Sequence, residues 1–314
     1  MYDDDPLAGF AYNDPTWKRA MKVARSRLTV DSSAWNLIKS SWYGEAETRD
    51  FIKTLSFSKL NPNCLLSAAE MNTSEFEPKA ATLEQAISFL GVRLCGVVLA
   101  INLACRQVLK TKPPSLWKKL FEEMMTTIEI GYRVGSKCKE IGIEGGALIG
   151  FARGAGLSLL MAENFKDYKK WHSMTGGFEN RELQIEMFGC EAYQVSAFAL
   201  QVLGFGPEIA LGAALGTGKL THAHVEYPRE ILRWKSAFQW IECLKEGKSF
   251  PKEIDAKNFF KELVPPGTSG QNLNLESLHA EVGKVRRTGS SWNWHLPGNS
   301  YEEVTKKISE KNQN

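Results

Sequence analysis

Apolar residues recur three and four positions apart along most of the chain and rarely alternate with polar ones. No two short alternating runs are joined by Asn-Gly or Asp-Gly, the usual signal of a β-hairpin. This spacing predicts a nearly all-α fold, built from helices that bury one face or their whole surface.

Clear breaks separate the predicted helices. Thr82 and Gln85 form a capping box, in which the side chains satisfy free amides at a helix start, and a long apolar helix is expected to follow through Val108. Pro113 and Pro114 then end it. The other predicted helices cover residues 115–141, 147–164, 185–203, 207–215 and 229–246.

Small residues are frequent in the segment 147–164, which carries almost no charge and is predicted to be a buried helix. Gly150, Gly154 and Gly156, together with Gly146 just before it, each cost a helix about 1 kcal/mol relative to Ala. Close packing must offset that cost, so we expect this helix to approach its neighbours closely.

The chain changes character towards both ends. Residues 1–27 are rich in Asp and Lys and are interpreted as a lead-in, followed by one helical domain at 28–245. Beyond it, the segments become short and polar, with a Pro- and Gly-rich linker at 265–270 and a last charged helix. Residues 246–314 are therefore predicted to be a C-terminal appendage.

The charge of the chain argues against nucleic acid as a partner. Its 39 basic and 36 acidic residues are mixed along the sequence, so no block of like charge forms an electrostatic footprint. The short basic stretches 18–27 and 284–287 are interpreted as solvated surface.

The cysteines and the apolar runs indicate where in the cell the protein is expected to be. Six cysteines show no CxxC spacing and several lie in apolar stretches, as reduced thiols do, so a cytoplasmic location is predicted. The acidic start leads into no apolar core, so no signal peptide is expected. The longest apolar run, 94–105, is shorter than the roughly 18–20 residues that cross a bilayer, and no membrane span is predicted.

Four segments follow one another in an order that is typical of one family. They are 60–72, with Leu60-Asn61-Pro62; 81–93, ATLEQAISFLGVR; 147–160, ALIGFARGAGLSLL; and 188–204, which begins with Phe-Gly. In these segments the chain resembles the HDOD family of HD-related output domains, whose patterns include ALxGLLHDIGxLxL and FGxxHxxVGAxLLxxWG. The resemblance covers about residues 28–245. It implies an HD-like helical bundle and a role in bacterial signal transduction.

The departures from the family pattern carry the functional prediction. In HD phosphohydrolases, an HD dyad and further His and Asp residues bind metal ions, which lower the pKa of a bound water. Here Arg153 and Gly154 stand at the dyad positions, and two other His positions fall near Thr126 and at Ala192. A guanidinium repels a divalent cation, and glycine has no ligand atom. The resemblance therefore implies a degenerate member with no catalytic residue, metal or cofactor.

The candidate ligand site is this vestigial HD pocket, defined as Thr126, Glu129, Arg153, Gly154 and Ala192. Arg153 offers forked donors to a phosphate or carboxylate, so one hypothesis is a small anionic ligand. The alternative is a structural ion pair of Arg153 with Glu129. The predicted function is a non-catalytic regulatory module that acts through a protein partner in a signalling pathway or through such a ligand.

The rival interpretation is a metal-dependent phosphohydrolase with an atypical ligand set. Its ligands would come from His222, His224, Glu226 and Glu129. The two histidines are two positions apart, so they share a face on a strand but not on a helix. Surface or capping histidines are the simpler interpretation.

Two other motifs were weighed. Gly216–Thr221 partly resembles a phosphate-binding loop, but Ala213 replaces its first glycine and Leu220 its hydroxyl residue, which favours a helix-terminating loop. Trp292 and Trp294 either contact a protein partner or pack back onto the domain.

Overall fold

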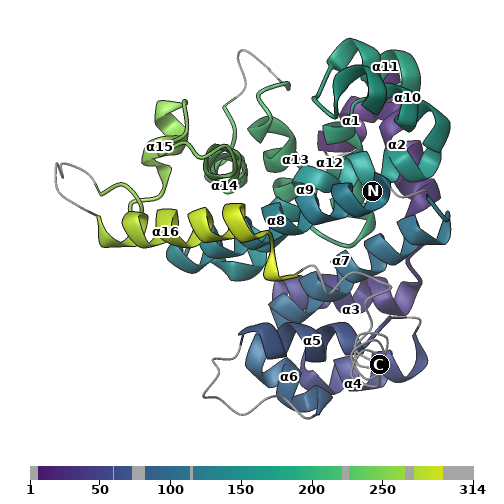
Figure 1. The fold of residues 1–314 in the computed structure, drawn as a ribbon. Coiled ribbons are helices and arrows are strands. Elements are labelled where there is room, and N and C mark those ends of the chain that lie inside the picture. Colours follow the sequence, from purple (N-terminus) through teal and green to yellow (C-terminus); the bar gives the residue numbers. More distant parts are fainter. Residues whose placement is uncertain are drawn as a thin grey trace, which may run out of the picture. The chain divides into compact units, whose positions relative to one another are not determined.

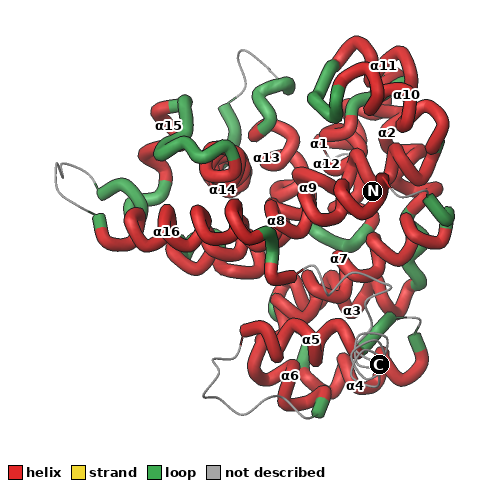
Figure 2. The backbone as a smooth tube through the Cα atoms, in the orientation of Figure 1, coloured by secondary structure: helices red, strands yellow, loops and turns green. Residues whose placement is uncertain are grey.

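The structure, a computed structural model, describes residues 6–58, 60–72, 82–113, 116–220, 226–265 and 272–292. These residues form sixteen α-helices and no β-strand (Figure 2). The prediction of an all-α fold is therefore confirmed. The helices gather in two compact units: unit 1 comprises 1–29 and 113–290, and unit 2 comprises 30–112 and 291–314.

These units differ from the predicted lead-in, domain and appendage. Residues 1–27 and 246–290 belong to unit 1, because their helices bury apolar side chains in it: Trp17 is 3% exposed and Leu278 is fully buried. Residues 30–112, predicted to be part of the central domain, cluster as a unit of their own. The boundaries between the two units depend on contacts between distant parts of the chain, and local composition does not predict such contacts.

The described part of unit 2 contains five helices: α3 (Ser32–Tyr43), α4 (Thr48–Phe57), α5 (Asn63–Asn72), α6 (Leu83–Leu90) and α7 (Val92–Lys110). The central helix is α7, because α3, α5 and α6 all contact it, while α4 contacts α3 and α6. Every residue of α7 from Leu94 to Cys105 is buried. The longest apolar run of the sequence is therefore the core of this unit.

The predicted start of α6 is confirmed, whereas the predicted end of this helix is wrong. The Thr82–Gln85 capping box is present, with each side chain accepting a hydrogen bond from the other residue's amide at 3.2 Å. The helix expected to continue to Val108 is instead broken at Gly91, whose φ of 77° lies in the region that favours glycine. Two helices therefore replace one.

The described part of unit 1 contains α1 (Pro6–Asn13), α2 (Pro15–Arg27), α8 (Leu116–Lys137), α9 (Gly142–Glu163), α10 (Phe165–Thr175), α11 (Arg181–Phe188), α12 (Ala192–Val202), α13 (Pro207–Gly216), α14 (Arg229–Lys245), α15 (Ile254–Phe259) and α16 (Leu273–Thr288). Helices α8 and α9 pack extensively on each other. Helices α2, α10, α12 and α14 cover α9, and α16 lies alongside α8 (Figure 1).

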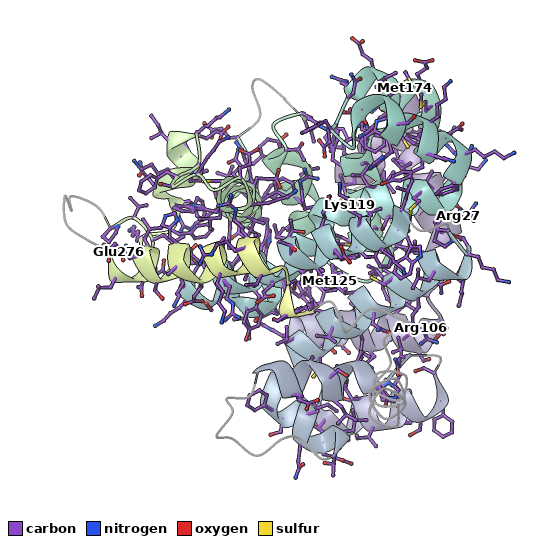
Figure 3. The ribbon with its side chains drawn as sticks, in the orientation of Figure 1. Arg27, Arg106, Lys119, Met125, Met174 and Glu276 are labelled. Carbon is purple, nitrogen blue, oxygen red and sulfur yellow. The ribbon has the colours of Figure 1, made fainter. Side chains whose placement is uncertain are left out.

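The C-terminal helix α16 is amphipathic. Leu278, Val282 and Val285 are buried on its inner side, whereas Glu276 is exposed on the opposite side (Figure 3). Spacings of three and four residues place the three apolar side chains on one face. This face holds α16 in unit 1 as part of its core.

Glycines bring α8 and α9 together, as the sequence predicted. A Cβ on Gly131 or Gly146 would collide with the carbonyl of the other glycine, and a Cβ on Gly150 would collide with the backbone of Thr127. The Thr127 hydroxyl donates a hydrogen bond to the Gly150 carbonyl at 2.9 Å. Residues 142–146, which lie between the predicted helices 115–141 and 147–164, belong to α9, where the close contact with α8 stabilises them.

By length and composition alone, two helices in the described part of the chain could cross a bilayer, namely α7 and α9. Their apolar windows are 72% and 94% buried inside the protein. Core helices of globular proteins pass the same test. The absence of a membrane span therefore stays a prediction.

Candidate functional site

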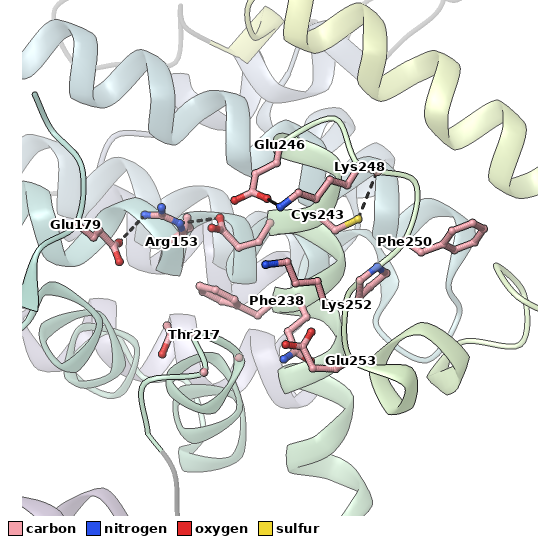
Figure 4. A pocket seen from close by; sticks show the side chains of 15 residues that line it. Arg153, Glu179, Thr217, Phe238, Cys243, Glu246, Lys248, Phe250, Lys252 and Glu253 are labelled. Atoms are coloured by element: carbon pink, nitrogen blue, oxygen red, sulfur yellow. Dashed lines mark hydrogen bonds and ion pairs between the residues drawn. The ribbon is translucent and has the colours of Figure 1, made fainter.

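A cavity of about 250 Å³ lies beside Arg153 in unit 1 (Figure 4). Arg153 reaches it from α9, Phe238 and Glu242 from α14, and Glu179 from the segment before α11. The loop 246–253, which links α14 to α15, forms the remaining wall with the end of α13. This volume is below the roughly 300–1,000 Å³ of sites for drug-sized ligands, so the cavity suits a smaller molecule.

Arg153 is held between two carboxylates. Its Nε lies 2.6 Å from Oε1 of Glu242, and its Nη1 lies 3.1 Å from Oε1 of Glu179. Burial lowers the pKa of Arg153, but the charges of Glu242 and Glu179 raise it by more, so the pKa lies above its ordinary value. The guanidinium is therefore a fixed cation whose charge is already neutralised.

The ion pairs continue away from the cavity. Nζ of Lys219 lies 2.5 Å from Glu179 and 3.8 Å from Glu191, and Arg181 lies 3.4 Å from Glu191. Burial raises the pKa of Glu179, but Arg153 and Lys219 lower it by more, so this carboxylate stays ionised. Lys219, the lysine of the segment that resembles a phosphate-binding loop, is thus engaged by carboxylates.

The five residues of the vestigial HD pocket do not share this cavity, since Arg153 alone of them lines it. Thr126 donates a hydrogen bond to the carbonyl of Glu122, one turn earlier in α8, at 2.9 Å. Ala192 is 6% exposed, and its carbonyl faces Gly156 of α9 so closely that a Cβ on that glycine would collide with it. Thr126 and Ala192 therefore take part in helix contacts and do not line this cavity, and a ligand site made of all five residues stays a prediction.

Gly154 lies against Met124 of α8. A Cβ on Gly154 would lie 2.8 Å from both Cβ and Cγ of Met124, closer than real Cβ contacts come. These atoms are near the backbone of Met124, so they yield less easily than the tip of its side chain. The second dyad position therefore has no room for a side chain in the present packing.

The structural ion pair expected at Arg153 is present, but its partner is not Glu129. Arg153 does form structural ion pairs, but with Glu179 and Glu242. Glu129 is 3% exposed, lies 3.2 Å from Arg133 one turn later on α8, and accepts a hydrogen bond from Ser290 at 2.8 Å. An i,i+4 partner on the same helix is the nearer cation for this glutamate.

The alternative metal ligands are dispersed or not described. His222 and His224 lie outside the described residues, Glu226 is exposed, and Glu129 is buried. Among the residues that the structure describes, no three His, Cys, Asp or Glu side chains are grouped so that they could hold a metal ion.

The two tryptophans near the C-terminus are only partly accounted for. Trp292 is 6% exposed, as expected if it packs back onto the protein. Trp294 lies outside the described residues. Contact of either ring with a protein partner stays a prediction.

Sequence reasoning missed most of the cavity. Glu242 and Gln239 lie on a helix that the sequence predicted, but Glu242 is 89 residues from Arg153 and no local pattern joins them. Glu179 and Lys252 lie in connecting segments, where spacing carries no signal of a shared site.

No family profile matches the chain, and no curated protein matches it. Among solved structures, the chain is similar to an HDOD domain protein of unknown function from Geobacter sulfurreducens. The similarity has a TM-score of 0.59 at 11% sequence identity, and it covers 89% of this chain and 99% of the other. At this identity the likeness concerns the fold, and it confirms the HDOD-like fold that the sequence motifs predicted.

Proposed function

We propose that this chain of HDOD-like fold is a non-catalytic regulatory module of signal transduction, which acts through protein contacts or a small ligand. The observation that carries the proposal is the packing of Gly154 on Met124 at the position where the family resemblance places the second metal ligand. An HD dyad needs a carboxylate there, and α8 occupies its space.

The first dyad position supports the same proposal. Arg153 is a permanent cation that two carboxylates hold in place at 2.6 and 3.1 Å. A divalent metal ion next to it would meet both charge repulsion and the loss of these ion pairs. Neither dyad position can therefore contribute to the activation of a water molecule.

The proposal includes a bacterial cytoplasmic setting, which the family resemblance implies. All six cysteines are buried free thiols. Burial raises their thiol pKa values, to about 12 for Cys95, Cys105 and Cys190. Such thiols are inert core residues, as expected in a reducing compartment.

The test is metal content and phosphodiester turnover of the purified full chain. We expect no stoichiometric Mn, Fe or Zn, and no hydrolysis of bis(p-nitrophenyl) phosphate above the rate of the free metal ion. A Glu129→Gln variant and a His222→Ala, His224→Ala double variant cover the alternative ligand set. Turnover that chelators abolish and that these variants lose would establish the phosphohydrolase instead.

A further inference from the structure

The cavity beside Arg153 carries opposite charges in nearly equal number. Four carboxylates and three cationic side chains line it. Arg153 is paired with Glu179 and Glu242, and Lys248 is paired with Glu246. A simple anion at Arg153 would meet two carboxylates that already neutralise the guanidinium, so a purely anionic ligand is disfavoured.

Two charged groups of the lining remain available. Lys252 and Glu253 form no ion pair with the other described residues. In Figure 4, Lys252 reaches inward from the loop in the direction of Phe238 and Arg153. The wall thus offers one unpaired ammonium group and one unpaired carboxylate.

A buried acceptor without a partner lies in the same wall. Gln239 is 8% exposed, and its Oε1 is buried with no hydrogen-bond partner among the described residues. Leaving such an atom unsatisfied destabilises the protein, and a ligand that donates a hydrogen bond to it would remove that cost. Gln239 and Glu242 are three residues apart on α14, so both present acceptors on one face.

We propose that this cavity binds a free α-amino acid. Its ammonium group donates to Gln239 and its carboxylate pairs with Lys252, in a lining that also carries the unpaired carboxylate of Glu253. Phe238 in the lining provides apolar surface for the side chain of the ligand. The inference rests on the proposed function in one respect, namely that this amino acid is the small ligand of the regulatory module.

The experiment measures binding of each of the twenty L-amino acids to the purified full chain, by thermal shift and then by isothermal titration calorimetry. We expect saturable 1:1 binding of at least one amino acid. Its methyl ester, which lacks the carboxylate charge, and its N-acetyl derivative, which lacks the ammonium group, should each bind about tenfold more weakly.

Variants connect the binding to the cavity. Lys252→Met changes an exposed side chain and should weaken binding about tenfold with the melting temperature of the free protein unchanged. Gln239→Leu removes the unsatisfied acceptor, so it should weaken binding without loss of stability. Lys261→Met, an exposed lysine outside the cavity, is the matched control and should bind as the unaltered chain does.

Each contrary result has a definite meaning. No binding by any amino acid, or binding that Lys252→Met and Gln239→Leu leave intact, overturns the inference. Full affinity for the methyl ester would make this a site for amines, and full affinity for the N-acetyl derivative would make it a site for anions; both overturn it as well. Chelator-sensitive phosphodiester turnover would overturn the proposed function, whatever the cavity binds.

Discussion

Gly131 of α8 and Gly146 of α9 face each other so closely that a methyl group on either would collide with the carbonyl of the other. This contact lets the two central helices of unit 1 pack backbone against backbone. It explains why a helix tolerates so many glycines despite their intrinsic cost of about 1 kcal/mol each.

Gly146→Ala should destabilise the protein by about 1–3 kcal/mol, because the added methyl forces α8 and α9 apart. Urea unfolding followed by circular dichroism measures the change. Gly9→Ala in α1 is the control, because a Cβ there meets nothing within 4 Å. It should be neutral or stabilise by up to about 1 kcal/mol through helix propensity. Equal effects of the two substitutions would contradict the close contact.

Substitutions that put an HD dyad back at positions 153 and 154 should not create a metal site. Gly154→Asp, alone or with Arg153→His, should lower stability by at least about 1–3 kcal/mol, because the side chain collides with Met124. It should create no metal site, as measured by metal content and by the effect of Mn²⁺ on the melting temperature. Gly283→Asp on α16 is the matched control, because its Cβ meets only Arg287, at 3.3 Å. A stable double variant that binds Mn²⁺ would show that the position has room after all.

Arg153→Met should destabilise the protein by about 2 kcal/mol at neutral pH, because Glu179 and Glu242 lose their shared cation while partly buried. Arg153 is the charge that lowers the folded-state pKa of Glu179 most, and Lys219 stays beside this carboxylate in the variant. Loss of Arg153 therefore raises the pKa of Glu179 relative to the unaltered protein, so the deficit of the variant is largest where this carboxyl is ionised and shrinks as pH falls and it is protonated. Denaturant unfolding from pH 4 to 7 measures this trend. A deficit that is constant over this range would rule out the electrostatic explanation.

Glu163 should contribute to stability only above acid pH. Its carboxylate lies 3.0 Å from Arg19 and 2.5 Å from Arg27, so it ties α2 to the end of α9. Burial raises the pKa of Glu163, but Arg27 and Arg19 lower it by more, so the folded-state pKa lies below its ordinary value. The stabilisation by Glu163 is fully present at pH values above the pKa of this carboxyl in the unfolded chain, about 4.3. It is lost as pH falls through the pKa of the carboxyl in the folded protein.

Glu163→Gln should therefore cost about 1 kcal/mol at pH 7, a figure reduced for the partial exposure of both arginines, and almost nothing near pH 2. Thermal unfolding at the two pH values gives the comparison. Glu276→Gln, an exposed change on α16, should have little effect at either pH. A cost for Glu163→Gln that persists at pH 2 would point to packing instead of charge.

Several helix ends show what local sequence cannot decide. The segment 185–203 was predicted as one helix, yet Gly189, with a φ of 73°, separates α11 from α12. Gly91 ends α6 in the same way, whereas Gly145 and Gly146 continue α9. A glycine can either end a helix or continue it. It continues the helix where close packing against a neighbouring backbone stabilises the helical conformation.

The sequence by itself determined the helical class, the Thr82–Gln85 cap and the buried character of the central glycine-rich helix, because spacing and capping act between residues a few positions apart. The family resemblance also placed Arg153 at the position of a metal ligand, which stays a prediction. Only the tertiary structure decided which carboxylates hold that cation, how the chain divides into units, and that Gln239 and Lys252 line one cavity with it. Those relations join residues that are distant along the chain, and they exist only once the helices have packed.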